Sequence, residues 1–283
     1  MTTNKQRREA AQRHLQKQLE RRAVVARRRR RNLLVGATIL AVLVVAGAAV
    51  LVTSIGGGKS NSAGATTSTS SGASASAAAA TTRADGTINC SYLPAAGGNT
   101  NLKDVGTPPN AATTQTRGTD TLKMSTNQGD LTLTLNRTTA PCASASMTYL
   151  ASKKFFDGSP CHREVNQTGF GVLQCGDPTG TGQGGPSYVF GTEVTDRTTY
   201  PRGTIAMANS GQPNSTGSQF FLCFTDTKLQ PDYTAVGKVD QAGLAVLDKI
   251  AAAGNDGSFD PSPGGGKPKL PVTITTMSVV GQG

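Results

Sequence analysis

The stretch that decides the fold is GTIAMANSGQPNSTGSQFFLCF, residues 203–224. Two apolar runs flank a loop rich in Gly, Ser and Asn, the pattern of two β-strands with a surface connection, and successive residues of a strand point to opposite faces. The face that we expect to join the core holds Phe220, Leu222 and Phe224. The opposite face holds Gln219, Phe221 and Cys223. An aromatic ring beside an amide on that face predicts a shallow peptide pocket, with burial of both faces as the alternative.

The same period-two alternation recurs in short runs through the second half of the chain. A β-hairpin is predicted around the turn at 127–130. Its inward-facing residues are Leu122, Met124, Leu131, Leu133 and Leu135. Further short strands are expected at 161–165, 171–174, 204–208, 218–224, 234–239 and 272–280.

Two segments have the 3.6-residue period of an amphipathic helix. The first begins at Pro141 and places on one face Ala143, Met147, Leu150 and Ala151. The second ends near Gly254 and places on one face Leu244, Leu247, Ile250 and Ala251. Many short strands with Gly-rich connections and only two helices predict a mainly β domain, as a closed antiparallel barrel or a sandwich.

The charge of the chain is concentrated at its N-terminus. Residues 1–31 carry 12 of the 28 Lys and Arg but only two of the 17 Asp and Glu, so this arm holds most of the net charge of +11. We interpret it as a cytoplasmic topology signal, with specific RNA or lipid recognition as the alternative. The globular part has no basic excess, so no nucleic-acid partner is expected.

An uncharged apolar run at 33–55 is long enough to cross a hydrocarbon core of about 30 Å. We predict one transmembrane helix at 32–55, with the basic arm inside the cell and the globular part outside. Cleavage as a signal peptide within 46–49 is the alternative. A Gly/Ser/Ala/Thr-rich linker is predicted at 56–117, pinned where Cys90 and Tyr92 interrupt it, and the globular domain at 118–283.

The chain has five cysteines, Cys90, Cys142, Cys161, Cys175 and Cys223. This number is consistent with an oxidising compartment, up to two disulfides and one remaining thiol, although sequence alone does not assign the pairs. Our hypothesis is that Cys161 pairs with Cys175, that Cys90 or Cys142 forms a second bond, and that Cys223 is the odd thiol. No C-x-x-C motif occurs and His162 is the only histidine outside the arm, so no metal site is expected.

Two further motifs suggest chemistry that we reject. The run Gly180–Gly185 satisfies G-x-G-x-x-G, but a strand-like segment follows it instead of the helix that a nucleotide site needs, so we interpret it as a surface loop. Cys161 and His162 are neighbours in a predicted strand and point to opposite faces, so they do not form a nucleophile and its base. By the same parity, Arg163 shares a face with Cys161 and Val165.

Several motifs of this half together resemble the active face of the cyclophilins, the peptidyl-prolyl cis-trans isomerases. They are CHREV at 161–165, LQCGD at 173–177, MANS at 207–210 and GSQFF at 217–221. The resemblance covers about the last 165 residues. It implies an eight-stranded barrel with a helix over each end, without a metal or other cofactor, and we expect a monomer.

The resemblance also implies roles for individual residues. The catalytic residues would be Arg163, Gln174 and Phe221. The substrate-binding residues would be Phe170, Val172, Gly182, Ala208, Asn209, Ser210, Gln219, Leu229 and Tyr233. The chain departs from the family pattern in two places: the segment that holds Phe170 is about three residues longer, and Lys228 stands where many members have Trp.

The activity implied is faster rotation of X-Pro bonds in proline-containing peptides and exported proteins. Arg163 would donate a hydrogen bond toward the prolyl nitrogen while an apolar pocket holds the proline ring. The alternative is a non-catalytic proline-binding adaptor or holdase of the cell envelope. The altered segment around Phe170 and the presence of Lys228 favour that alternative.

Overall fold

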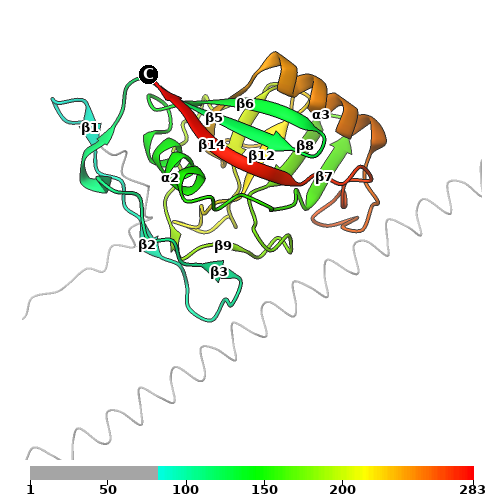
Figure 1. The fold of residues 1–283 in the computed structure, drawn as a ribbon, viewed down its shortest axis with the longest axis horizontal. Coiled ribbons are helices and arrows are strands. Elements are labelled where there is room, and N and C mark those ends of the chain that lie inside the picture. Colours follow the sequence, from blue (N-terminus) through cyan, green and yellow to red (C-terminus); the bar gives the residue numbers. More distant parts are fainter. Residues whose placement is uncertain (1–81) are drawn as a thin grey trace, which may run out of the picture. The chain divides into compact units, whose positions relative to one another are not determined.

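The structure is a computed structural model that describes residues 82–283 (Figure 1). The predicted basic arm at 1–31 and the predicted transmembrane helix at 32–55 lie outside the described residues. Within 82–283, no helix is both long and apolar enough to span a bilayer. This part of the chain is mainly β, with two α-helices packed on one curled sheet.

One eight-stranded antiparallel sheet forms the body of the domain, in the order β14-β5-β6-β13-β11-β12-β8-β7. Its strands are β5 (Thr119–Thr126), β6 (Gly129–Asn136), β7 (Arg163–Gln167), β8 (Phe170–Cys175), β11 (Thr204–Met207), β12 (Phe220–Cys223), β13 (Ala235–Val239) and β14 (Ile274–Gln282). The predicted hairpin is confirmed as β5 and β6. The other predicted strands are present with bounds shifted by a few residues.

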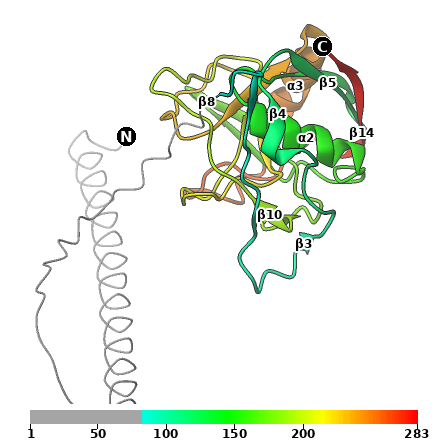
Figure 2. The same cartoon turned by 90° about the vertical axis from the view of Figure 1, so that its left-hand side faces the viewer.

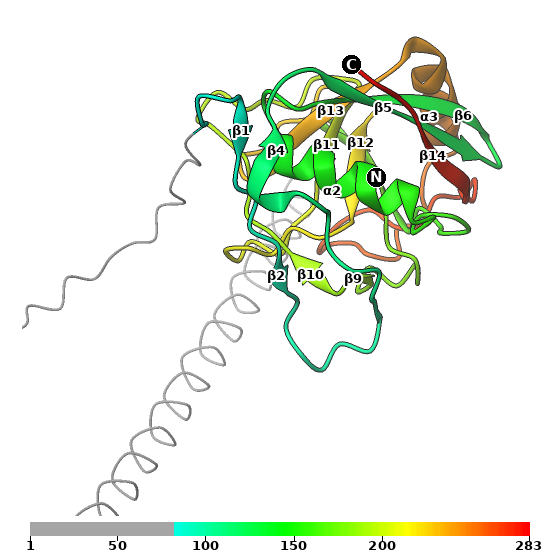
Figure 3. The ribbon, with the colours of Figure 1, turned by 60° about the vertical axis from the view of Figure 1, so that its left-hand side comes forward.

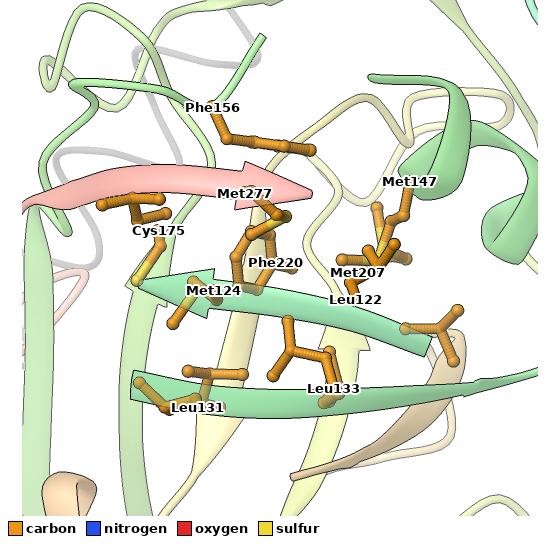
Figure 4. Close-up of a cluster of buried hydrophobic side chains, with 14 of the residues drawn as sticks. Leu122, Met124, Leu131, Leu133, Met147, Phe156, Cys175, Met207, Phe220 and Met277 are labelled. Atoms are coloured by element: carbon orange, nitrogen blue, oxygen red, sulfur yellow. The ribbon is translucent and has the colours of Figure 1, made fainter. Parts of the chain in front are cut away.

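The main core lies inside the curl of the sheet (Figure 4). All five inward residues of the predicted hairpin are buried, with at most 1% of their surface exposed. Phe220 and Leu222 from β12 join them, as the alternation predicts, and Figure 4 shows Phe220 among side chains from several strands. The predicted core face of β12 is therefore confirmed.

The prediction of a closed barrel is wrong, because no ladder joins the two end strands, β14 and β7. The loop that contains Gly266 pairs with the free edge of β7 instead. Glu164 and Gly266 exchange two backbone hydrogen bonds, of 2.7 and 3.0 Å. Just upstream, the Cys161 N–H donates to the Val272 carbonyl at 2.9 Å. The sheet is thus an open half-barrel, and the segment before β14 lies where a closed barrel would have β14 itself.

The helices α2 (Pro141–Ser152) and α3 (Gln241–Ala253) match the two predicted segments. α2 packs against β5 and β14 (Figure 2), and α3 packs against β6. The N–H groups of Cys142 and Ala143 at the start of α2 donate to the Glu193 carboxylate, both at 2.9 Å. Asp240 caps α3 by accepting the Gly243 N–H at 2.9 Å.

Residues 82–117, which we call the strap, fall within the predicted linker but carry regular structure (Figure 3). Its elements are β1 (Thr87–Ile88), β2 (Leu93–Pro94), β3 (Leu102–Lys103), the 3-10 helix η1 (Ala111–Thr113) and β4 (Thr114–Gln115). β3 pairs with β9 (Gly185–Pro186) and β2 with β10 (Tyr188–Val189). The Cys90–Cys142 disulfide and a 2.8 Å hydrogen bond from Tyr92 to the Cys142 carbonyl attach the strap to α2. The expected pinning at Cys90 and Tyr92 is confirmed.

β7 begins at Arg163, two residues later than predicted. Cys161 therefore lies outside the strand alternation: it is buried in the main core and bonded to Cys175, whereas Val165 lies in a second cluster on the other face. The predicted shared face of Cys161 with Arg163 and Val165 is wrong for this reason. The pairing of Cys161 with Cys175 is confirmed, and Cys223 is the free cysteine of the described residues.

Candidate active site

A single row of residues crosses four strands on the face of the sheet opposite the main core. The register places Arg163 of β7 beside Gln174 of β8, Gln174 beside Phe221 of β12, and Phe221 beside Ala206 of β11. Residues opposite each other on neighbouring strands share a face, with Cβ atoms about 4.5–5.5 Å apart. The structure therefore brings together the three residues predicted as catalytic.

Apolar side chains form a second cluster around this row. Its buried members are Val165, Val172, Tyr200, Ala206, Phe221 and Cys223. Packed against them are Phe170, Ala208, Leu229, Tyr233 and Ala235. Phe221 is only 6% exposed, and its ring meets Tyr233 edge-on with 5.5 Å between centroids. Phe221 is thus the floor of an apolar surface rather than a protruding ring.

The guanidinium of Arg163 is held on three sides. Nη1 donates to Gln174 Oε1 at 3.1 Å, Nη2 to the Pro263 carbonyl at 2.7 Å and Nε to the Gly264 carbonyl at 3.0 Å. A guanidinium has five N–H donors, so one N–H on Nη1 and one on Nη2 remain. Burial lowers the pKa of Arg163 from 12.5, but the side chain stays cationic at neutral pH.

A chain of hydrogen bonds continues from Arg163 across the site. Gln174 Nε2 donates to Gln219 Oε1 at 3.0 Å, and Gln219 Nε2 donates to the carbonyls of Gly182 and Gly184, both at 3.1 Å. Arg163 can only donate and carbonyls can only accept, so the direction of every bond in the chain is determined. Gln219 and Gly182, both predicted to bind substrate, therefore also support the row that contains Arg163 and Gln174.

The predicted segment Ala208, Asn209 and Ser210 follows β11 at the rim of the second cluster. The Ala208 N–H donates to the Gln219 carbonyl at 2.8 Å, so the segment continues the pairing with the chain before β12. The Asn209 side chain donates to the Asp232 carbonyl at 2.8 Å and accepts the Gly211 N–H at 2.9 Å. The Ser210 N–H donates to Ser215 Oγ at 3.2 Å.

The longer segment around Phe170 is accommodated by the β7–β8 hairpin. Phe170 is the first residue of β8, pairs with Gln167 and packs half-buried against the second cluster. The exposed Lys228 lies beside this turn, where its N–H donates to the Gly169 carbonyl at 2.7 Å, and Leu229 follows it into the cluster. All twelve predicted site residues are thus on this face or on the loops at its rim.

Sequence reasoning missed two parts of the site. Tyr200 is buried, and its hydroxyl donates to the Tyr233 carbonyl at 2.8 Å and accepts the Tyr233 N–H at 2.9 Å. The carbonyls of Pro263 and Gly264 hold Arg163 from about 100 residues away. No local pattern identifies either contact, because backbone carbonyls carry no sequence signature.

The thiols and the histidine near the row are not placed for acid–base or nucleophilic chemistry. Cys223 is fully buried, and burial raises the pKa of its thiol to about 12. His162 is 8% exposed, and burial lowers its pKa, although Asp177 opposes this. Cys161 is in a disulfide, so the rejected pairing of Cys161 with His162 does not occur.

Two cavities of about 820 Å³ lie beside the strap and contain none of the predicted site residues. One is bordered by the strap and α2, and the other by the strap and the loop at 190–199. The candidate site is therefore a surface on the sheet, separate from both cavities.

Comparisons with known proteins agree with this geometry. The family model described as "Cyclophilin type peptidyl-prolyl cis-trans isomerase/CLD" matches residues 121–279. The "Probable peptidyl-prolyl cis-trans isomerase B" of Mycobacterium leprae is 42% identical over 203 residues, which cover 67% of this chain and 66% of that protein. Its Mycobacterium tuberculosis counterpart is 40% identical over 201 residues, with 67% and 63% covered. The chain thus spans slightly less than two thirds of each relative.

Solved structures show the same fold. A cyclophilin-type isomerase of Cryptosporidium parvum is 28% identical, with a TM-score of 0.50 over 58% of this chain and 98% of its own. A second structure of that protein, in the presence of the dipeptide Ala-Pro, matches with the same TM-score and identity. The family model covers more than half of this chain and contains the whole row from Arg163 to Ala206. The chain therefore belongs to the family of cyclophilin-type peptidyl-prolyl cis-trans isomerases.

Proposed function

We propose that this protein is a peptidyl-prolyl cis-trans isomerase that accelerates rotation about X-Pro bonds. The observation that carries the proposal is the row of Arg163, Gln174 and Phe221, in which an oriented cation adjoins an apolar floor. The family match and the names of the relatives support the same reaction. The relative solved with Ala-Pro supports a proline-containing peptide as the ligand class.

The mechanism follows from the electronic structure of the amide. Rotation about a peptide bond faces a barrier of about 18–20 kcal/mol, because it breaks the resonance between nitrogen and carbonyl. As the bond twists, the lone pair returns to the prolyl nitrogen and becomes a hydrogen-bond acceptor. A free N–H of Arg163 would donate to it, and this bond is stronger in the twisted transition state than in either planar ground state.

The apolar cluster would hold the proline ring while the rest of the substrate turns. Val172, Phe221 and Leu229 offer carbon surface beside Arg163. The Asn209 side chain is engaged with Asp232 and Gly211, and we assign its backbone the role of pairing with the extended substrate. Gln174 orients Arg163 and would limit how far the guanidinium moves during rotation.

We also propose an extracytoplasmic location, with the domain tethered to the membrane through the predicted helix at 32–55. Two disulfides support an oxidising compartment, since such bonds are rare in proteins of the cytosol. The basic arm before the apolar run supports an N-terminus inside the cell. Exported proteins with exposed X-Pro bonds would then be the substrates.

The test uses NMR to measure the rate of cis-to-trans exchange of a short Ala-Pro peptide in the presence of the full chain in detergent. We expect acceleration by the wild type and a loss of at least about tenfold in Arg163→Ala, equal to about 1.4 kcal/mol of transition-state stabilisation. Peptide affinity should fall less than the rate. Arg197→Ala, which removes an exposed arginine from a loop outside the row, is the matched control and should keep the wild-type rate.

The same experiment separates the enzyme from a proline-binding adaptor or holdase. Saturable peptide shifts without faster exchange would establish binding alone and reject the isomerase. An equal loss of rate and affinity in Arg163→Ala would contradict the role of Arg163 in the transition state.

A further inference from the structure

We infer that Asp177 is a positioning residue of the site: its buried carboxylate shapes the loop 177–184, whose carbonyls orient Gln219 and, through Gln219 and Gln174, the guanidinium of Arg163. The inference rests on the proposed isomerase function and adds to it a residue outside the catalytic row. Asp177 does not contact the row itself, so its effect must pass through the loop.

The Asp177 carboxylate is enclosed by the loop that it begins. It is fully buried, and Oδ1 accepts the Thr179 N–H at 2.7 Å and the Thr179 hydroxyl at 2.8 Å, while Oδ2 accepts the Gly182 N–H at 2.6 Å. Within residues 82–283, no Lys or Arg forms an ion pair with it. Neutral hydrogen-bond donors of its own loop therefore stabilise the buried charge of Asp177.

The charge state of Asp177 is consistent with this arrangement. Burial raises the pKa of the carboxyl, but hydrogen bonds from Gly184, Thr179 and Gly182 outweigh burial and hold the pKa below its ordinary value. The carboxylate is therefore ionised at neutral pH. An ionised carboxylate only accepts hydrogen bonds, so it imposes a single inward orientation on the N–H groups around it.

The loop approaches the carboxylate too closely for a side chain at Gly184. A Cβ atom on Gly184 would lie 1.9 Å from Asp177 Oδ1 and 3.0 Å from Thr179 Oγ1. Gly182 has a φ of +79°, a backbone conformation that residues with side chains rarely adopt. The G-x-G-x-x-G run of this chain thus has a structural use, which is to wrap a carboxylate of the protein itself.

The carbonyls of the same two glycines face the catalytic row. Those of Gly182 and Gly184 both accept from Gln219 Nε2, and this pair of acceptors determines which end of the Gln219 amide faces Gln174. If the loop loosens, the Gln219 amide can turn, and Gln174 loses the acceptor that keeps its own oxygen toward Arg163. Arg163 keeps its bonds to Pro263 and Gly264, so the expected loss is partial.

The experiment measures kcat and KM for Ala-Pro exchange with the full chain in detergent. Asp177→Asn keeps the shape of the side chain but turns one acceptor into a donor that faces backbone N–H groups. We expect kcat to fall about fivefold to tenfold, with KM changed less than twofold. Asp240→Asn is the matched control, because Asp240 also accepts two backbone N–H groups, from Gly243 and Thr132, but lies at the start of α3.

A double-mutant cycle separates positioning from a general loss of structure. If Asp177 acts through Gln219, Asp177→Asn combined with Gln219→Ala should be no slower than Gln219→Ala alone. A structural role without this connection would make the two losses multiply. Thr179→Val, which removes one donor to the carboxylate, should reproduce a smaller part of the kcat loss and decides the question if Asp177→Asn does not fold.

The outcomes distinguish this inference from the proposed function. No acceleration by the wild type would overturn the isomerase and this inference with it. Acceleration by the wild type with unchanged kcat in both Asp177→Asn and Thr179→Val would overturn only the role of Asp177. Multiplying losses in the double variant, or an equal kcat loss in Asp240→Asn, would do the same.

Discussion

Arg163 and Glu164 are neighbours on β7, but their side chains lie on opposite faces of the sheet, and only Arg163 has hydrogen-bond partners for its charge among the described residues. Arg163 lies half-buried on the face of the candidate site with three hydrogen-bond partners. Glu164 is fully buried beside Leu173 of the main core, and neither of its oxygens has a hydrogen-bond partner among residues 82–283. A carboxyl buried without donors holds its proton to a higher pH, because an unpaired buried charge is costly. The site face thus stabilises its charge by supplying partners, whereas burial on the core face disfavours the charge of Glu164.

The largest effects are expected from truncating one aromatic ring on each face of β12. Phe220 is fully buried in the main core, so Phe220→Ala should lower the free energy of unfolding by about 3–5 kcal/mol. Phe221→Ala removes the floor of the proposed proline pocket. It should lower kcat/KM for an Ala-Pro peptide by more than about tenfold, with a smaller loss of stability because Phe221 belongs to the smaller of the two clusters.

Urea unfolding and peptide exchange, measured on both variants, check this prediction. Phe220→Leu, which retains most of the apolar volume, is the control for the core face. Equal losses of stability and activity in both variants would show that the two faces are not separate in function.

The next effect is a dependence of stability on pH that comes from Glu164. Burial raises the pKa of Glu164 to about 7 from an ordinary value of 4.5, with Lys269 opposing the shift. A carboxyl with a raised pKa contributes stability that is fully present below its unfolded pKa and is lost as the pH rises through the folded pKa. The free energy of unfolding should therefore fall between about pH 4.5 and pH 7, by on the order of 3 kcal/mol.

Thermal unfolding of Glu164→Gln across this pH range is the measurement. The variant should lose the part of the slope that Glu164 contributes and be more stable than the wild type at pH 7.5. Burial also raises the pKa of Glu193 to about 7, although two helix N–H groups oppose this, so Glu193→Gln should remove a share of the slope similar to that removed by Glu164→Gln. An unchanged slope in Glu164→Gln would show that Glu164 is charged in the folded state.

The smallest effect is expected at Cys223, which lies on the site face but is as buried as a core residue. Because burial raises the pKa of its thiol to about 12, Cys223 should resist alkylation in the native protein and react once the chain is unfolded. Cys223→Ala should leave kcat/KM within about twofold and cost about 1 kcal/mol of stability. Mass spectrometry that found rapid native labelling of Cys223 would show that this face opens to solvent.

The two faces were not equally predictable from the sequence. Apolar and polar residues alternate along most of β5 and β6, so the inward side chains of these two strands follow from period two alone. At the start of β7 the same rule failed for Cys161, because the regular strand begins only at Arg163. The prediction of a closed barrel was wrong for a related reason. The edge of β7 is paired with a loop at Gly266, and no strand pattern in the sequence marks that loop.

The candidate site was likewise only partly predictable from the sequence. The family motifs drew attention to Arg163, Gln174 and Phe221, but only the register of three strands places them in one row. The strap carried no strand signal, because each of its strands is only two residues long. In addition, β3 and β2 find their partners at Gly185–Pro186 and Tyr188–Val189, far along the chain. Tyr200 was missed because nothing in its local sequence marks it as a support for Tyr233.

By itself, the sequence determined the mainly β class, the two helices, the faces of the longer strands and an odd cysteine left after pairing. These features depend on the order of apolar and polar residues within a few positions, where local geometry is enough. Only the tertiary structure decided that the sheet stays open, that the strap folds onto the domain and that Arg163 is held by carbonyls 100 and 101 residues away. Each of these contacts uses backbone groups that carry no sequence signature, so long-range packing alone selects which of them meet.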